Sequence, residues 1–190
     1  MLRHKIWSSV DDVRCGIIND IDNFLAYSNY ILNCPPIFLP TQDGVFTTGE
    51  KSLQDIYKNS LLTNDIAEHA LSMAFPYVRL KTYIEIRVAD SMPFNFTLSL
   101  LALIKGVFYN QFAIEELLQK FGHVKKECIE SGFLELKKHG YEADIYGYKA
   151  KDLLILIFDL AKKGLNSKEK EFLKPFRDLV SINKVVKDIL

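Results

Sequence analysis

Polar or phenolic residues alternate with apolar or β-branched residues between Tyr77 and Val88, with Thr82 among the even positions, and this stretch constrains the fold more than any other part of the chain. The polar or phenolic residues occupy the odd positions: Tyr77, Arg79, Lys81, Tyr83, Glu85 and Arg87. A period of two is typical of an extended strand, whose side chains point alternately to opposite faces. We expect the even, apolar face to pack on a hydrophobic layer and the odd face to gather three cations and a carboxylate. An ordinary strand with a solvated outer face would show the same pattern.

The rest of the chain predicts one hairpin and many helices. Residues 2–7 indicate a short strand, and residues 37–39 and 45–48 flank Asp43-Gly44, a dipeptide typical of tight hairpin turns. Helices are expected at residues 20–32, 52–59, 64–73, 93–109, 113–121, 123–138, 150–163 and 167–189. The predicted class is therefore α+β. A partial antiparallel sheet packed against helices should occupy residues 1–110, and an all-helical segment over 111–190 should pack on it as one structural unit.

Composition argues against several kinds of partner. The 190 residues carry a formal net charge of zero, so no basic surface for nucleic acid is expected. The apolar run from Phe94 to Tyr109 is shorter than the roughly 20 residues of a membrane span, which argues against a membrane partner. Cys15, Cys34 and Cys128 are widely spaced and odd in number, which supports neither a disulfide framework nor a zinc site. Residues 1–5 lack the apolar segment of a signal peptide, and we expect a cytoplasmic protein.

Residues 75–81, 83–87 and 89–90, with Pro93, closely resemble the signature strand of glutamate-cysteine ligases of the plant and proteobacterial type. Arg3, Ile6-Trp7, Asp12, Arg14 and Gly16 resemble the segment that opens the second half of those enzymes. The resemblance covers most of this chain but only about half of a family enzyme. It implies half of a glutamine-synthetase-like ligase fold.

The resemblance also implies ATP-dependent ligation, the first step of glutathione synthesis. In such enzymes the γ-carboxylate of glutamate takes the terminal phosphate of ATP, and the amine of cysteine then displaces phosphate from γ-glutamyl phosphate. The expected substrates are glutamate, cysteine and ATP, with Mg²⁺ on the phosphates. Glu85 is the expected metal ligand, because magnesium prefers carboxylate oxygen. Arg87 is the expected catalytic residue, because its guanidinium can hold a phosphate or carboxylate with two hydrogen bonds.

Three more residues are expected at the substrates. Arg79 belongs to the same polar row as Glu85 and Arg87, Arg14 matches an arginine of the family's substrate cleft, and Thr48 falls near a threonine of the amino-acid pocket. A turn arginine paired with Asp12 explains Arg14 equally well.

Two departures from the family pattern lie beside the signature strand. Val88 replaces a glycine, and residues 91–94 replace a glycine-rich turn. The family's other magnesium-binding glutamates and much of its nucleotide site precede the region that this chain matches. We therefore expect the isolated chain to be inactive and either to self-associate or to require a partner that supplies the other half. Two alternatives remain open. One is a degenerate or partner-dependent homologue that acts as a binding module or joins glutamate to another amine. The other is an unrelated α+β interaction domain.

Overall fold

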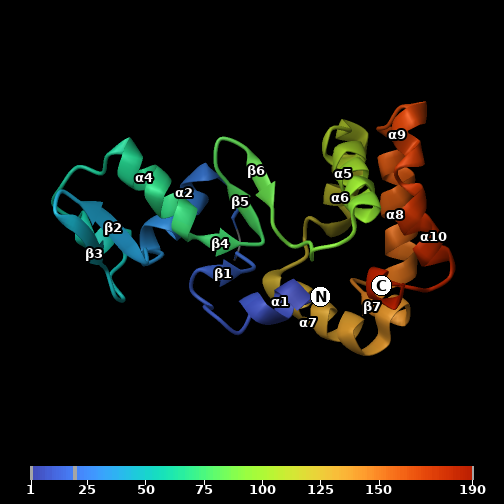
Figure 1. The fold of residues 1–190 in the computed structure, drawn as a ribbon, viewed down its shortest axis with the longest axis horizontal. Coiled ribbons are helices and arrows are strands. Elements are labelled where there is room, and N and C mark those ends of the chain that lie inside the picture. The colour runs from blue at the N-terminus through green and yellow to red at the C-terminus, as the bar shows by residue number, and fades with distance from the viewer. Residues whose placement is uncertain (1, 19–20, 190) are drawn as a thin grey trace. The chain divides into compact units, whose positions relative to one another are not determined.

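The computed structural model describes residues 2–18 and 21–189, and the chain forms two compact units that divide between Asp90 and Ser91 (Figure 1). The sequence pattern instead predicts a division near residue 110. Short two-stranded sheets and many helices confirm the predicted α+β class.

In the described residues of the first unit there are four helices and six short strands. Three of the helices begin at residue types that commonly cap helices. The side chains of Asn23, Ser52 and Thr63 accept hydrogen bonds from backbone N–H groups in the first turns. The expected start of the first of these helices at residue 20 lies outside the described residues. The elements are α1 (Leu2–Trp7), β1 (Cys15–Gly16), α2 (Phe24–Asn33), β2 (Phe38–Thr41), β3 (Gly44–Thr47), α3 (Leu53–Ile56), α4 (Asn64–Met73), β4 (Phe75–Pro76), β5 (Val78–Leu80) and β6 (Ile84–Ile86).

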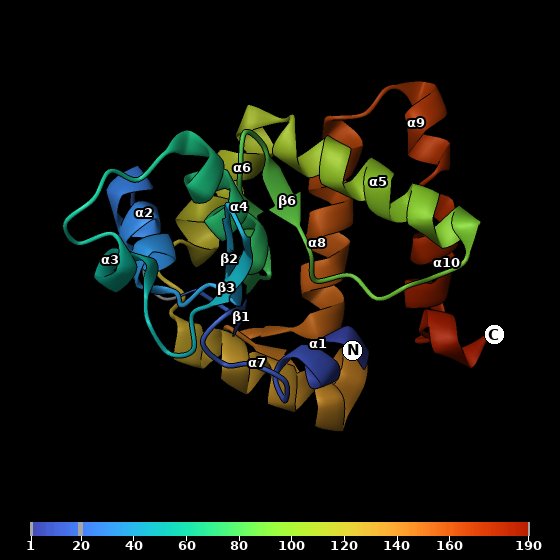
Figure 2. The ribbon, with the colours of Figure 1, turned by 60° about the vertical axis from the view of Figure 1, so that its left-hand side comes forward.

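The strands of this unit that the structure describes form three two-stranded sheets. Strands β2 and β3 form the predicted hairpin, with Thr41 opposite Gly44 (Figure 2). Strands β5 and β6 are also antiparallel, and β1 pairs in parallel with β4, so that Cys15 lies opposite Phe75. The last pairing joins the start of the unit to the segment that carries the predicted site.

The prediction of one continuous strand over residues 77–88 is wrong. The chain turns at residues 81–83, and Arg79 of β5 lies opposite Glu85 of β6. The predicted burial is also reversed, because Arg79 is buried whereas Val78 and Ile84 are 50% and 60% exposed. Within the polar row, Arg79, Arg87 and Glu85 are protected whereas Tyr83 is 60% exposed, and the contacts of Arg79 given below explain this protection.

The prediction of a strand at residues 2–7 is also wrong, since these residues form α1. The carboxylate of Asp90 accepts hydrogen bonds from the backbone N–H groups of Leu2 and Arg3, at 3.1 and 2.6 Å. First-turn N–H groups have no partner within a helix, so this distant carboxylate stabilises the helical conformation.

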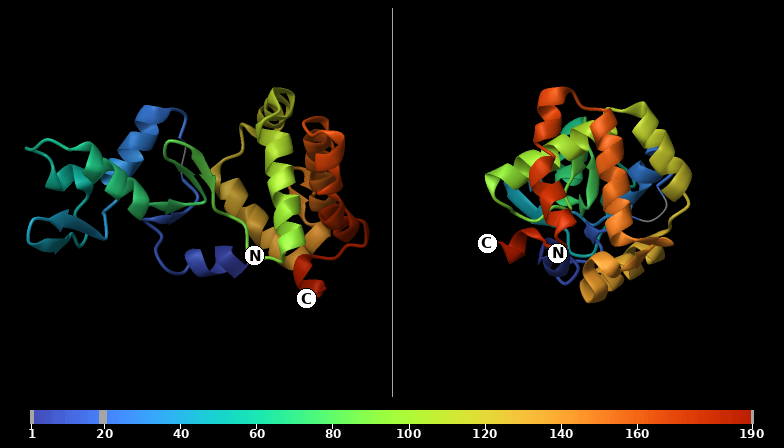
Figure 3. Two further views of the ribbon diagram at one scale, coloured as in Figure 1. Left: turned by 45° about the horizontal axis from the view of Figure 1, so that its top comes forward. Right: turned by 90° about the vertical axis from the view of Figure 1, so that its right-hand side faces the viewer.

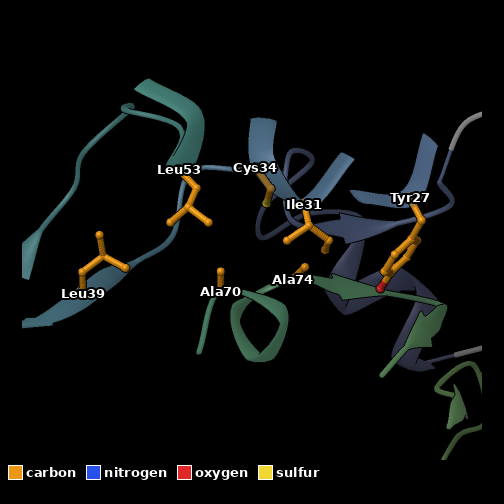
Figure 4. Close-up of a cluster of buried hydrophobic side chains, with 7 residues drawn as sticks. All are labelled: Tyr27, Ile31, Cys34, Leu39, Leu53, Ala70 and Ala74. Atoms are coloured by element: carbon orange, nitrogen blue, oxygen red, sulfur yellow. The ribbon is translucent and has the colours of Figure 1, made fainter. Parts of the chain in front are cut away.

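The core of the first unit lies between α2 and α4. Tyr27, Ile31 and Cys34 of α2 and its cap face Ala70 and Ala74, and Leu39 and Leu53 complete the cluster (Figure 4). The hydroxyl of Tyr27 donates to the carbonyl of Leu80 and accepts from its N–H, at 3.1 and 3.0 Å. The core therefore fixes the end of β5 directly.

The second unit is mainly helical. Its helices α5 and α8 lie side by side (Figure 3). They approach closely because Gly106 and Gly164 have no side chains, and a Cβ built on Gly106 would lie 2.4 Å from the carbonyl oxygen of Ala161. The elements are α5 (Phe94–Phe108), α6 (Gln111–Phe121), α7 (Lys126–His139), η1 (Gly140–Glu142), β7 (Asp144–Ile145), β8 (Tyr148–Lys149), α8 (Ala150–Lys163), α9 (Ser167–Glu171), α10 (Lys174–Ser181) and η2 (Val186–Asp188).

Two local features differ from the helices expected here. A hairpin joins β7 to β8 through Tyr146 and Gly147, which both have positive φ, as such two-residue turns require. The single helix expected over residues 167–189 is wrong, because the chain forms α9, α10 and η2 instead. Pro175 lies in the first turn of α10, where its missing N–H is tolerated, and it cannot continue a helix from the preceding turn.

Within the described ranges, no single helix has the length and apolarity needed to cross a membrane; α5 and α6 together meet the length and composition test, but the chain bends by 85° between them.

Candidate functional site

Three of the five predicted site residues meet on the β5–β6 hairpin. Glu85 lies between two arginines: its Oε2 accepts from Nε of Arg79 at 2.7 Å, and its Oε1 accepts from Nη1 of Arg87 at 3.0 Å. The hydrogen bond from Arg79, together with the charges of both arginines, lowers the pKa of Glu85 against a partial desolvation that raises it. Two guanidinium groups and one carboxylate leave this cluster with one net positive charge.

Arg79 is only 7% exposed and binds the end of a helix. Its Nη1 donates to the carbonyls of Ser72 and Ala74 at 3.0 and 3.1 Å, and it lies 3.5 Å from the carbonyl of Leu71. The last carbonyls of α4 have no partner within the helix, and a cation at a helix C-terminus is favourable. This contact explains why the polar row of the hairpin faces inward.

Arg87 differs from Arg79 in how its guanidinium group is used. Its Nη1 donates to Glu85, and its central carbon lies over the ring of Phe75, 5.6 Å from the ring centroid. Among the described residues, Nε and Nη2 of Arg87 donate no hydrogen bond, and the side chain is 15% exposed. Nε and Nη2 form one edge of the guanidinium, and such an edge binds a carboxylate or phosphate with two parallel hydrogen bonds. Arg87 therefore keeps a binding edge available.

Arg14 and Thr48 do not join this cluster through any contact in the described structure. Nε of Arg14 donates to the carbonyl of Pro35 at 2.7 Å, and its Nη1 pairs with Asp11, not with Asp12, at 2.5 Å. Thr48 is buried and its hydroxyl donates to the carbonyl of Pro36. Both side chains hold the backbone at the base of the β2–β3 hairpin.

The sequence interpretation assigned no role to the aromatic residues around Arg87. Phe75 and Trp7 stack with their ring centroids 5.6 Å apart and their planes at 28°, and Phe75 in turn covers Arg87. The sequence signal that could have indicated a role for Trp7 and Phe75 is their position in the segments that carry the family resemblance.

Comparison with known proteins agrees with this geometry. Residues 2–151 match the family described as glutamate-cysteine ligase family 2, a range that holds all five predicted site residues. The chain belongs to this family. The match confirms the resemblance read from residues 75–93.

Known glutamate-cysteine ligases of plants are similar along nearly the whole chain. The chloroplastic glutamate-cysteine ligase of Nicotiana tabacum is 26% identical over 194 residues, which cover 94% of this chain and 37% of the tobacco protein. The chloroplastic glutamate-cysteine ligase A of Oryza sativa subsp. indica is 27% identical, over 95% of this chain and 39% of its own length. The chain thus spans about two-fifths of the length of these ligases.

The chemistry expected of the family requires a divalent cation held by several oxygen ligands. No three His, Cys, Asp or Glu side chains in the described part of the chain gather closely enough to hold a metal ion. Both carboxylate oxygens of Glu85 accept hydrogen bonds from arginines. The donor set of this chain by itself does not fit magnesium, so any site that includes Glu85 needs further oxygen ligands from elsewhere.

A cavity of about 280 Å³ lies beside the core of the first unit, but it does not contain the site. Its walls come from α2, α3, α4 and the end of β5, and none of the five predicted site residues lines it. The lining residues are Phe24, Tyr27, Ser28, Ile31, Leu32, Leu53, Leu62, Ala67, Leu71, Leu80 and Lys81. The candidate site of this family member is therefore the Arg79–Glu85–Arg87 cluster.

Proposed function

We propose that this chain supplies an anion-binding arginine to an ATP-dependent glutamate-cysteine ligase whose remaining site comes from polypeptide outside these residues. The observation that carries the proposal is the Nε–Nη2 edge of Arg87, which donates no hydrogen bond to the described residues while Glu85 and Phe75 hold the rest of the guanidinium. Membership of the family supports the choice of reaction.

The reaction proposed has two steps. The γ-carboxylate of glutamate attacks the terminal phosphorus of ATP, so that γ-glutamyl phosphate forms and ADP leaves. The amine of cysteine then attacks the acyl carbon, phosphate leaves, and the nitrogen loses a proton as γ-glutamylcysteine forms. Arg87 binds a carboxylate of glutamate or the phosphoryl oxygens. There its positive charge stabilises the negative charge that develops during phosphoryl transfer.

The other residues of the site support Arg87. Glu85 occupies Nη1 of Arg87, and Arg79 holds Glu85 in place from the end of α4. The side chains of Arg79, Arg14 and Thr48 already donate hydrogen bonds to protein oxygens. We propose that Arg79 positions the β5–β6 hairpin and that Arg14 and Thr48 position the base of the β2–β3 hairpin. Direct substrate contact by any of them would require those hydrogen bonds to exchange.

Magnesium and ATP remain part of the proposal as cofactor and co-substrate. The metal would neutralise phosphate charge when bound, and its further oxygen ligands would come from a partner polypeptide or a second copy of the chain. Such a partner would also pair with the open edges of the two-stranded sheets. The proposed place of this reaction is the cytoplasm.

A binding module without turnover, or a ligase of another amine, is the second candidate. It is favoured by Val88, which directly follows Arg87 and whose side chain is 47% exposed where a glycine was expected.

The test combines activity with binding. The purified chain should release no ADP from ATP in the presence of glutamate, cysteine and Mg²⁺. Co-expression with the part of the tobacco ligase that this chain does not match should restore turnover. Steady ADP release by the isolated chain would contradict the need for a partner.

Variants then test the assignment of the site in the restored enzyme. Arg87→Lys keeps the charge but loses the two-donor edge and should lower kcat at least about a hundredfold. Lys81→Gln, which removes a cation from the adjoining turn, is the matched control and should keep near-normal activity. Equal activity of both variants would refute the role of Arg87. Formation of a glutamyl amide with another amine, but not with cysteine, would favour the second candidate.

A further inference from the structure

Four side chains of the first unit form a continuous stack that ends on Arg87. The guanidinium of Arg3 lies 5.7 Å from the ring centroid of Trp7, Trp7 stacks on Phe75, and Phe75 faces the guanidinium of Arg87. We call these residues, Arg3, Trp7, Phe75 and Arg87, the ring stack. Each end is a cation and the middle is aromatic, an order in which every contact is attractive because cations bind the negative faces of aromatic rings.

The backbone fixes the ring stack at several points. The N–H of Phe75 donates to the carbonyl of Arg14 at 2.6 Å, and the N–H of Arg87 donates to the carbonyl of Tyr77 at 2.8 Å. Asp90 holds the first turn of α1, which carries Arg3 and Trp7. The rings therefore lie on anchored segments, and they can restrain a guanidinium that rests on them.

Arg87 is consequently restrained in two directions. Glu85 fixes one nitrogen within the guanidinium plane, and Phe75 restrains movement of that plane towards the ring. A hydrogen bond to Nη1 alone would still allow the group to rotate about that bond. The ring prevents this rotation, so the Nε–Nη2 edge keeps one direction.

We propose that Phe75 is a positioning residue for Arg87, with Trp7 as the support of its ring, and that the ring stack holds the Nε–Nη2 edge ready for a carboxylate or phosphate. The proposal rests on the proposed function in one respect, namely that this edge binds an anion. It assigns to α1 a part in the site, beside the hydrogen bond between the His4 ring and the hydroxyl of Tyr77 and the two backbone hydrogen bonds to Asp90.

A purely structural role for Phe75 makes a different prediction. If Phe75 only fills space, leucine should serve nearly as well as another ring. If the ring face restrains Arg87, Phe75→Tyr should behave like the wild type and Phe75→Leu should not. The pair of variants therefore separates aromatic contact from apolar packing.

The experiment uses the full chain labelled with ¹⁵N at arginine. The order parameter of the Arg87 Nε–H bond is measured by NMR relaxation, with Arg177, an arginine of α10, as the internal reference. We expect Arg87 to be ordered in the wild type and in Phe75→Tyr, and to become mobile in Phe75→Leu and, to a smaller extent, in Trp7→Leu. An Arg87 signal that stays equally ordered in Phe75→Leu would overturn the proposal, whether or not any anion binds.

The second readout is binding of glutamate and of ATP to the same chains by calorimetry. Where the wild type binds either ligand, Phe75→Leu should weaken its affinity about two- to thirtyfold, and Phe75→Tyr should restore it. Unchanged affinity in Phe75→Leu, beside a loss in Arg87→Lys, would refute positioning while the role of Arg87 stands. Binding that survives Arg87→Lys would instead refute the anion role of Arg87, and the order parameter would still decide the question of positioning.

Discussion

The buried position of Arg79 predicts that it stabilises the fold far more than its neighbour Arg87 does. Replacement by methionine in Arg79→Met keeps most of the side-chain length but removes every donor. The carbonyl of Ala74 is then buried without this partner, the carbonyl of Ser72 loses a hydrogen bond, and Glu85 loses one of its two cations.

The magnitude follows from these three losses. A buried polar group without a partner costs about 1–3 kcal/mol, and the two partly exposed groups should each contribute about 1 kcal/mol. We therefore expect Arg79→Met to lower the free energy of unfolding of the first unit by about 3–5 kcal/mol. At a urea dependence of about 2 kcal/mol per molar, the midpoint should fall by roughly 2 M.

Trp7 is the single tryptophan of the chain, so its fluorescence reports urea unfolding of the first unit selectively. Arg87→Met is the matched control, since it removes one hydrogen bond to Glu85 and one ring contact and should cost about 1 kcal/mol. If Arg79→Met lowers the midpoint no more than Arg87→Met does, the reasoning that separates a structural from a binding arginine is refuted.

Two further expectations concern pH and helix packing. Because Arg79 and Arg87 lower the pKa of Glu85 from its usual 4.5, the ionised carboxylate stabilises the fold above about pH 4.5, and this contribution is lost as pH falls through the lowered pKa. The stability gap between wild type and Glu85→Gln should therefore shrink between pH 7 and pH 3 in urea titrations, and a constant gap would contradict the ion pairing. In the second unit, Gly106→Ala should destabilise by about 2–3 kcal/mol or more, because its Cβ would overlap the backbone of Ala161. Gly132→Ala, whose Cβ would meet its nearest neighbour at 3.7 Å, should raise stability by about 0.5–1 kcal/mol. Thermal unfolding followed by circular dichroism measures both variants. Equal stability of the two would contradict the close approach of α5 and α8 at Gly106.

Local sequence signals predicted the elements that depend on local physics. Helix α4 follows a capping threonine, α8 ends before Gly164, and the β2–β3 hairpin turns beside Asp43-Gly44. In each case the residues that decide the structure lie within a few positions of it. The same local reading identified the segment that carries Arg79, Glu85 and Arg87.

The hairpin in residues 77–88 could not be recognised from its periodicity. Partners in β5 and β6 are Val78 with Ile86, Arg79 with Glu85, and Leu80 with Ile84, so even positions pair with even and odd with odd. Paired residues of antiparallel strands share a face, and the alternation therefore continues unchanged through the turn. The turn itself contains no glycine, proline or asparagine to mark it.

Other differences arise from contacts that join distant parts of the sequence. Helix α1 is capped by Asp90, and the polar row faces inward because Arg79 binds the end of α4. Backbone carbonyls at the end of α4 surround Arg79 and use its donors, whereas the Nε–Nη2 edge of Arg87 donates no hydrogen bond to the described residues. Such contacts have no signature in a single sequence, so the role of Arg79 could not be separated from that of Arg87 before the structure.

The pairing of β1 with β4 has a consequence for the order in which the first unit folds. Cys15 meets Phe75 sixty positions later, whereas the β2–β3 and β5–β6 ladders close over turns of a few residues. Short loops close within about 10–100 ns, and each doubling of loop length adds about 0.6 kcal/mol of entropy. Both hairpins can therefore form early and independently. We expect the parallel bridge that brings α1 and Trp7 to Phe75 to close last, after the helices between them have shortened the loop.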